Sequence, residues 1–114
     1  MEAQHQPMLH ALRDIWERIV SRSGQIYQDR MLRGFKDMFK GGMWQYELTV
    51  QGLTPAIEEC FAVRQYLGAA NLATDSLELT GQVDLPDIIY LDERVNKMTT
   101  LVRNAICFAN DLFL

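Results

Sequence analysis

The chain has 114 residues, of which 48% are hydrophobic and 23% charged, and its formal net charge is −4. This length is enough for one domain with a modest core but too short for a large enclosed cavity. The negative charge and the lack of basic patches argue against nucleic acid or an acidic membrane as the main partner. The sequence opens with no signal segment and contains no apolar run long enough to span a bilayer, so we expect a cytoplasmic protein.

The two cysteines, Cys60 and Cys107, lie far apart in apolar surroundings. Their number and spacing are typical of neither a zinc site nor a disulfide framework. We therefore predict two buried free thiols.

Helical periodicity begins near the N-terminus. Apolar residues spaced i, i+3, i+4 and i+7 predict a first amphipathic helix, and they are Met8, Leu9, Leu12, Ile15, Trp16, Ile19 and Val20. A second run has its apolar stripe at Tyr27, Met31, Leu32, Phe35, Met38 and Phe39, and continues past Gly41-Gly42 to Leu48. Because glycine weakens a helix, this pair predicts either a local bend or the close approach of another element.

The third helix is predicted to begin near Thr54, with this hydroxyl as N-cap and Pro55 in the first turn. Glu58 and Glu59 would favour its positive end. The glycine at position 68, among small residues, predicts a break in this helix.

Residues 81–86 are predicted to be a connection, and a long final helix follows it. Its apolar positions are Val95, Met98, Leu101, Val102, Ala105, Phe108, Ala109 and Leu112. No segment of any length has the alternation of a strand, so the fold class is all-α.

The final helix is apolar around much of its circumference, as expected for a helix that is surrounded by others. It is still in period at Leu114 and has no stop signal. We interpret residues 1–114 as a single partial domain that is truncated at both ends.

Two polar features stand out in these apolar helices. Arg64 precedes the Gly68 break, and its guanidinium fork matches the oxygens of a phosphate. From the pattern alone, an ion pair with Glu58 or Glu59 on the same helix is the simpler interpretation. Asn110 and Asp111 interrupt the last apolar stripe, where such a pair is costly to bury unless it binds something. Oxygen ligands of this kind suit Mg²⁺, although one pair cannot hold the ion alone.

Taken together, these features resemble the class I terpene synthases of the bacterial type. Residues 63–68, Val-Arg-Gln-Tyr-Leu-Gly, are similar to the diphosphate-sensing stretch of that family. Residues 108–113, Phe-Ala-Asn-Asp-Leu-Phe, resemble the opening of its second metal-binding motif, Asn-Asp-Leu-x-Ser-x-x-x-Glu. Asn110 follows Arg64 by 46 residues, which is the family's usual spacing.

The resemblance implies a part of a class I α-helical bundle that ionises a prenyl diphosphate, commonly farnesyl diphosphate, and cyclises the carbocation. Arg64 would bind the diphosphate, while Leu67 and Gly68 would occupy the linker and effector positions. Asn110 would be a Mg²⁺ ligand of the complete protein, and Asp111 would support that site. The stabilisation of growing charge on the leaving diphosphate by cations and donors is a sound physical basis for these roles.

The sequence also departs from the family pattern. Leu114 stands where the motif has Ser or Thr, the terminal Glu is absent, and the chain contains no Asp-rich motif. We therefore expect the isolated chain to be inactive.

Two alternatives remain open at this stage. The first is a degenerate domain like a chain-elongating prenyl transferase, against which Asn110 argues. The second is a non-catalytic helical interaction module, in which Trp16, Tyr27, Phe35 and Trp44 would form a partner groove.

Overall fold

The computed structural model of the protein describes residues 2–113, and side chains from residue 6 onward. In this range the chain forms helices and no strand, which confirms the all-α class. The helices are α1 (Glu2–Ser21), α2 (Gln25–Gln51), α3 (Ile57–Leu67), α4 (Ala70–Thr80), α5 (Asp87–Tyr90) and α6 (Glu93–Phe113). None of the helices in residues 2–113 is both long enough and apolar enough to cross a bilayer.

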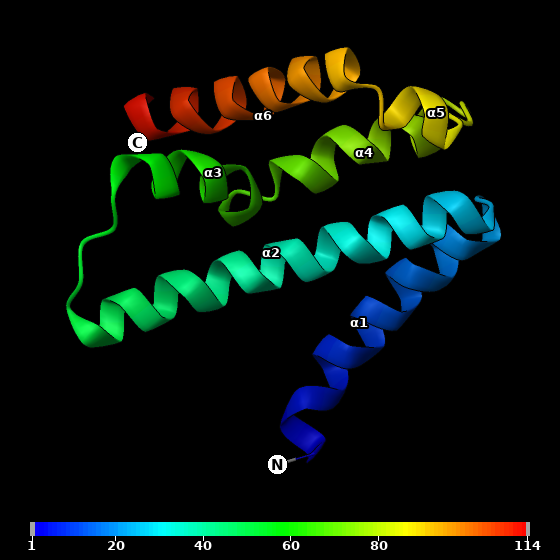
Figure 1. The fold of residues 1–114 in the computed structure, drawn as a ribbon. Coiled ribbons are helices and arrows are strands. Elements are labelled where there is room, and N and C mark those ends of the chain that lie inside the picture. The colour runs from blue at the N-terminus through cyan, green and yellow to red at the C-terminus, as the bar shows by residue number, and fades with distance from the viewer. Residues whose placement is uncertain (1, 114) are drawn as a thin grey trace.

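The helices are arranged in layers (Figure 1). The consecutive helices α3 and α4 form the middle layer, with the long helix α2 on one side and α6 on the other. Helix α1 diverges from the start of α2 and points away from the layers. The short helix α5 was not expected from the sequence, because four residues are too few to show a helical period.

Helix α2 is continuous through Gly41 and Gly42. Of the two expected explanations for these glycines, the close approach of another element applies, and not a bend. Gly41 is buried, and a Cβ atom there would lie 3.3 Å from Val63 Cγ1 and 3.4 Å from Tyr66 Cβ. The missing side chain therefore allows α3 to approach α2 closely. Helix α2 ends at Gly52, whose φ of 67° is left-handed and whose hydrogen bonds form a Schellman motif.

The expected start of the third helix near Thr54 is wrong. Helix α3 begins at Ile57, and the residue before it, Ala56, is extended and provides no side-chain cap. Residues 53–56 are not helical, and Ala56 takes the N-cap position that Thr54 was expected to hold. The acidic residues Glu58 and Glu59 do lie in the first turn, as predicted.

The predicted helix break is confirmed. Helix α3 ends at Leu67 with Gly68 as its C-cap, and α4 starts at Ala70. Between them Ala69 has a φ of 56°, a left-handed conformation that costs a residue with a side chain about 1–2 kcal/mol. A strained residue therefore marks the junction of the two helices.

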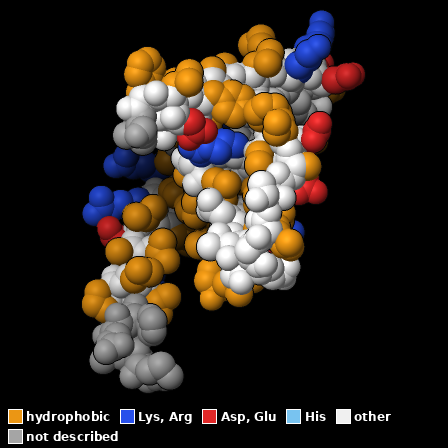
Figure 2. All heavy atoms as spheres, turned by 90° about the vertical axis from the view of Figure 1, so that its left-hand side faces the viewer, with side chains coloured by type: hydrophobic (Ala, Val, Ile, Leu, Met, Phe, Trp, Pro, Cys, Tyr) orange, Lys and Arg blue, Asp and Glu red, His pale blue; other side chains and the backbone are white. Residues whose placement is uncertain are grey.

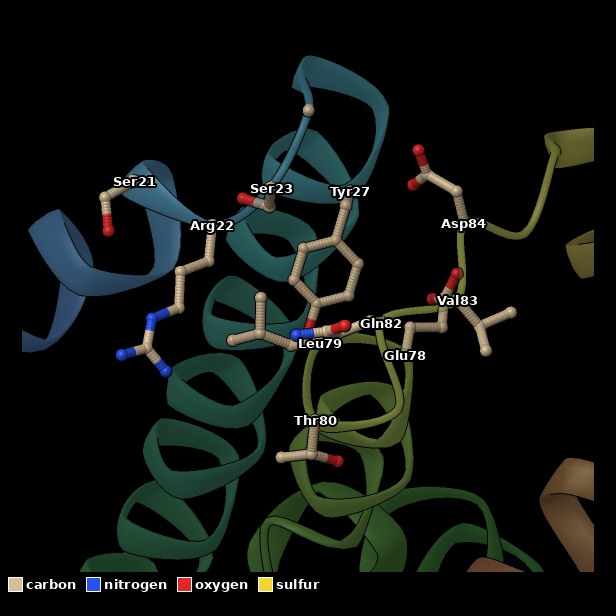
Figure 3. Close-up of a pocket in the computed structure, with 11 residues that line it drawn as sticks. Ser21, Arg22, Ser23, Tyr27, Glu78, Leu79, Thr80, Gln82, Val83 and Asp84 are labelled. Carbon is tan, nitrogen blue, oxygen red and sulfur yellow. The ribbon is translucent and has the colours of Figure 1, made fainter.

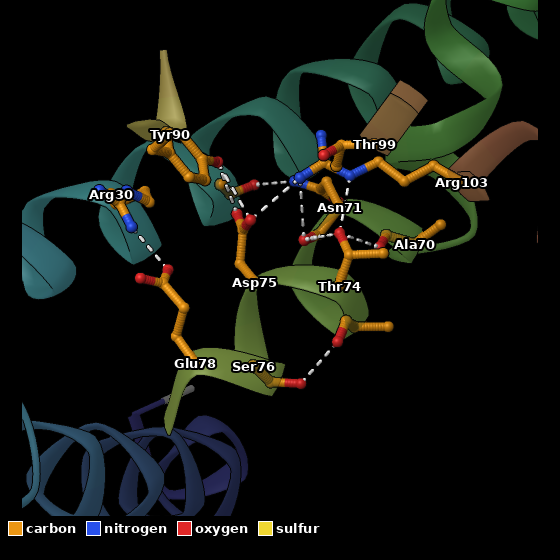
Figure 4. Close-up of polar contacts among 12 residues, drawn as sticks. Arg30, Ala70, Asn71, Thr74, Asp75, Ser76, Glu78, Tyr90, Thr99 and Arg103 are labelled. Carbon is orange, nitrogen blue, oxygen red and sulfur yellow. Dashed lines mark hydrogen bonds and ion pairs between the residues drawn. The ribbon is translucent and has the colours of Figure 1, made fainter. Parts of the chain in front are cut away.

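A network of buried charged and polar side chains fixes α4 between its neighbours (Figure 4). On one side, the guanidinium of Arg30 in α2 pairs with Glu78 and with Asp87 and lies 3.7 Å from the centre of the Tyr90 ring. Tyr90 in turn donates a hydrogen bond of 3.0 Å to Asp75, which also pairs with an arginine of α6. Because these bonds are directional, they define how α4 is rotated as well as where it lies.

The apolar core of the described residues is small. Only Ile19, Tyr27, Met31, Ala70 and Cys107 are buried hydrophobic residues, and as many polar or charged residues are buried. Trp16 and Phe35 pack on this core and Trp44 is half-buried. The aromatic side chains of the alternative partner groove therefore do not share an open groove, because Tyr27 is inside the protein.

We predict that Arg30→Met lowers the free energy of unfolding by about 3–5 kcal/mol, since it leaves the buried Glu78 carboxylate without its charged partner. Urea denaturation followed by circular dichroism measures this loss. The matched control is Arg18→Met, because Arg18 is 76% exposed and pairs only with Asp14 on the surface, a type of pair that contributes about 1 kcal/mol or less. Equal losses in the two variants would contradict a stabilising role for the buried pair.

Candidate functional site

Arg64 lies in the last turn of α3 and pairs with Asp111 of α6. Its Nη2 donates to Oδ1 of Asp111 at 2.7 Å, and its Nε donates to Oδ2 at 3.0 Å. This two-point geometry is the strongest that a guanidinium and a carboxylate can adopt. The simpler interpretation from sequence, a pair with Glu58 or Glu59, is therefore wrong.

The electrostatics of the two groups reflect this pairing. The hydrogen bonds from Arg64 lower the pKa of Asp111, and the hydrogen bond to Asp111 raises the already high pKa of Arg64. Both side chains reach solvent, with 22% of Arg64 and 49% of Asp111 exposed. The pair is therefore open to competition from a dissolved anion.

Gly68 provides the space in which the Arg64 guanidinium lies. A Cβ atom at position 68 would be 2.8 Å from Nη1 of Arg64 and 3.2 Å from Sγ of Cys107. The backbone of Gly68 has ordinary dihedral angles, so the requirement for glycine here is one of space. Cys107 is buried as predicted, and its thiol lies 3.6 Å from the Arg64 carbonyl oxygen, whereas Cys60 is only half-buried.

Aromatic side chains adjoin this arginine. The rings of Phe61 in α3 and Phe108 in α6 pack edge to face, with centroids 5.3 Å apart. Each precedes one partner of the ion pair by three residues, which is close to one helical turn. Leu67, the expected linker residue, is half-buried and lies toward Gly41 of α2.

Asn110 is exposed on α6 beside Asp111. Its amide oxygen is a suitable ligand for a hard cation. However, residues 6–113 contain no group of three His, Cys, Asp or Glu side chains that could hold a metal ion. The described residues thus provide one candidate ligand and not a complete metal site, and Leu114, the position expected to differ from the family motif, lies outside them.

A large cleft lies elsewhere in the described residues. It has a volume of about 820 Å³ and is open, with Arg22 and Tyr27 on one wall and Glu78 and Asp84 on the other (Figure 3). None of the predicted site residues lines it. The candidate site therefore remains at Arg64.

The structure brings Arg64, Gly68 and Asp111 together, leaves Asn110 exposed next to them and turns Leu67 toward α2. The sequence identified these residues but not the pairing of Arg64 with Asp111. A signal was present, since Arg64 and Asp111 carry opposite charges within apolar stretches of the sequence. Which cationic residue pairs with Asp111 depends on the packing of α3 on α6, and the sequence does not show this packing.

We predict that Arg64→Gln raises the pKa of Asp111 toward the ordinary aspartate value, as measured by NMR titration of the carboxyl carbon. Because the pKa is lowered in the folded chain, the pair stabilises the fold above a pH of about 3.9, and this contribution is lost as the pH falls through the lowered pKa. Glu58→Gln on the same helix is the control and should leave Asp111 unchanged. An unaltered pKa in Arg64→Gln would refute the pairing.

Comparisons with known proteins find three similar synthases. The chain is 25% identical over 107 residues to (+)-eremophilene synthase from Sorangium cellulosum, covering 94% of the chain and 32% of the relative. It is 26% identical over 111 residues to (+)-T-muurolol synthase ((2E,6E)-farnesyl diphosphate cyclizing) from Roseiflexus castenholzii, covering 97% and 34%. It is 27% identical over 106 residues to (−)-delta-cadinene synthase from Streptomyces clavuligerus, covering 93% and 32%.

The chain thus spans about a third of the length of the curated relatives that it matches. No solved structure matches it significantly. The family described as "Terpene synthase family 2, C-terminal metal binding" matches residues 1–114, the whole of the chain. The chain belongs to this family of terpene synthases.

Proposed function

We propose that the chain is part of a terpene cyclase that ionises a prenyl diphosphate, with Arg64 as a diphosphate-binding residue. The observation that carries this proposal is the arrangement of Arg64 at the end of α3, paired with Asp111 and seated over Gly68. The name of one relative, which is described as farnesyl diphosphate cyclizing, supports farnesyl diphosphate as the substrate. A cytoplasmic location is part of the proposal.

The hydrogen bonding of Arg64 suits an exchange of anions. Asp111 occupies Nε and one hydrogen of Nη2, whereas Nη1 lies over Gly68 and forms no hydrogen bond to another side chain described here. A guanidinium has five N–H donors, so a diphosphate can bind Nη1 first and then compete for the edge that Asp111 holds. A positive group at this point stabilises the negative charge that grows on the leaving diphosphate.

The proposal assigns to Asn110 the role of one Mg²⁺ ligand in the complete protein, with Asp111 in support. When bound, a divalent cation would neutralise diphosphate charge. The further ligands would have to come from residues beyond those that the structure describes. This chain would contribute one oxygen ligand, the side-chain amide of Asn110 on α6, which is next to Asp111 in sequence.

We further propose that residues 1–114 form a partial domain that works within a larger synthase. Large hydrophobic side chains are exposed on all the long helices and are spread over the face of the molecule in Figure 2. They include Leu9 at 59%, Met43 at 64%, Phe61 at 54% and Leu101 at 61% exposure. A cavity for an apolar substrate must be enclosed by such side chains. The curated relatives are about three times as long as this chain, so a protein of that length has room for further helices that could cover these side chains.

The diphosphate assignment predicts binding of inorganic pyrophosphate at Arg64. Isothermal titration calorimetry measures the affinity, and NMR shifts of the Arg64 Nε–H group in the wild type locate the site. Arg64→Lys should weaken this binding about tenfold, because an ammonium cannot reproduce the two-point hydrogen bonding of the guanidinium. The matched control is Arg94→Lys, which changes an arginine that is 92% exposed at the start of α6. Equal affinities in the wild type and in Arg64→Lys would rule out this role.

The partial-domain proposal predicts that the 114-residue polypeptide, incubated with farnesyl diphosphate and Mg²⁺, releases no cyclic hydrocarbon or alcohol. The physical reason is that its apolar side chains face solvent, so a carbocation formed there would be captured by water. Gas chromatography of the extracted products is the measurement. Cyclic products above those of a boiled sample would contradict the proposal.

A further inference from the structure

The guanidinium of Arg103 contacts both helices that flank the break (Figure 4). From α6, its Nη1 donates to Oε1 of Gln65 in α3 at 3.2 Å. On the α4 side, its Nε donates to the Thr74 hydroxyl at 2.7 Å and its Nη2 to Asp75 at 3.0 Å. One side chain therefore joins three helices at the point where the middle layer is interrupted.

This contact is buried. Arg103 is 11% exposed and Asp75 is 6% exposed, and Gln65 is buried as well. Burial raises the pKa of Asp75, although Arg103 and a tyrosine hydroxyl act in the opposite direction. A buried guanidinium is costly unless its donors are bound, and here all three nitrogens have partners.

The place of Arg103 on α6 connects it to the candidate site. Arg103, Cys107 and Asp111 are spaced by four residues, so they lie on one stripe of the helix. Cys107 contacts the Arg64 carbonyl, and Asp111 pairs with the Arg64 guanidinium. A helix advances about 1.5 Å and turns about 100° per residue, so a small slip or rotation at Arg103 would separate Asp111 from Arg64.

We propose that Arg103 is a positioning residue for Arg64. By holding α6 against α3 and α4 at once, it sets the rotation and axial position of the stripe that ends at Asp111. Gln65, the neighbour of Arg64 in sequence, carries the link to α3. This inference rests on the proposed function in so far as Arg64 binds the diphosphate.

The test uses Arg103→Lys and Gln65→Met in the 114-residue chain, with Arg94→Lys as the control on the same helix. Lysine keeps the charge but cannot bind Gln65, Thr74 and Asp75 together. Gln65→Met removes only the link to α3 and leaves the buried pair with Asp75 intact. The Gln65 variant therefore tests the proposal even if Arg103→Lys does not fold.

Two measurements are made on each variant that has the circular dichroism of the wild type. The first is the NMR resonance of the Arg64 Nε–H group, which reports the pair with Asp111 and needs no ligand. The second is the affinity for inorganic pyrophosphate. We expect the Arg64 resonance to move toward that of a free guanidinium in Gln65→Met, and pyrophosphate affinity to fall about tenfold, as is typical when a residue that orients a ligand is removed. Arg94→Lys should change neither.

An unchanged Arg64 resonance and affinity in a folded Gln65→Met or Arg103→Lys would overturn the proposal, even if the variant were less stable. A wild-type chain that does not bind pyrophosphate at all would refute the proposed function instead. In that case the Nε–H resonance alone still decides whether Arg103 positions Arg64.

Discussion

Two buried arginines, one on each side of α4, hold the layers of the described structure together. Arg30 reaches α4 from α2, and Arg103 reaches it from α6. Since few apolar side chains are buried in this part of the chain, charged hydrogen bonds take over the task of specifying how the helices meet. Apolar contacts are not directional, whereas a guanidinium that makes several charged hydrogen bonds restricts how the helices can be oriented.

The same constraint gives the helix break its form. Helix α4 is held on both sides, so the backbone must change direction within Gly68 and Ala69 to connect it with α3. Ala69 takes up a left-handed conformation that it would not favour in a free chain. Strain of this kind persists where the surrounding contacts leave the backbone no other conformation. The strained residue is next to Gly68, over which the Arg64 guanidinium lies.

Periodic and local patterns were sufficient to predict the long helices and the break at Gly68, because each depends on neighbours in sequence. At Gly41-Gly42 the same patterns left a bend and a close approach as alternatives, because only the packing of α3 on α2 decides between them. The start of α3 was placed too early because Thr54 and Pro55 form a favourable local start signal, whereas in the structure Ala56 is the N-cap residue. The pairing of Arg64 could not be predicted for a different reason. Nearby glutamates and a distant aspartate are equivalent partners in sequence, and only the packing of α6 selects among them.

The buried network was not foreseen because its members look like surface residues in the sequence. Arg30 and Glu78 are charged residues in amphipathic helices, where solvent exposure is the ordinary expectation. Their burial follows from the meeting of α2, α4 and the 81–86 connection, whose backbone nitrogen at Leu85 also binds Glu78. Local sequence patterns predict that such residues are exposed, and only the three-dimensional structure shows that they are buried.

The glycine at position 41 has a consequence for the orientation of the site. Since α3 rests against α2 through Val63 and Tyr66, the opposite side of α3 is turned toward α6, and Arg64 lies on that side. A residue with no side chain, more than twenty positions earlier in the sequence, thus determines the direction in which the guanidinium points.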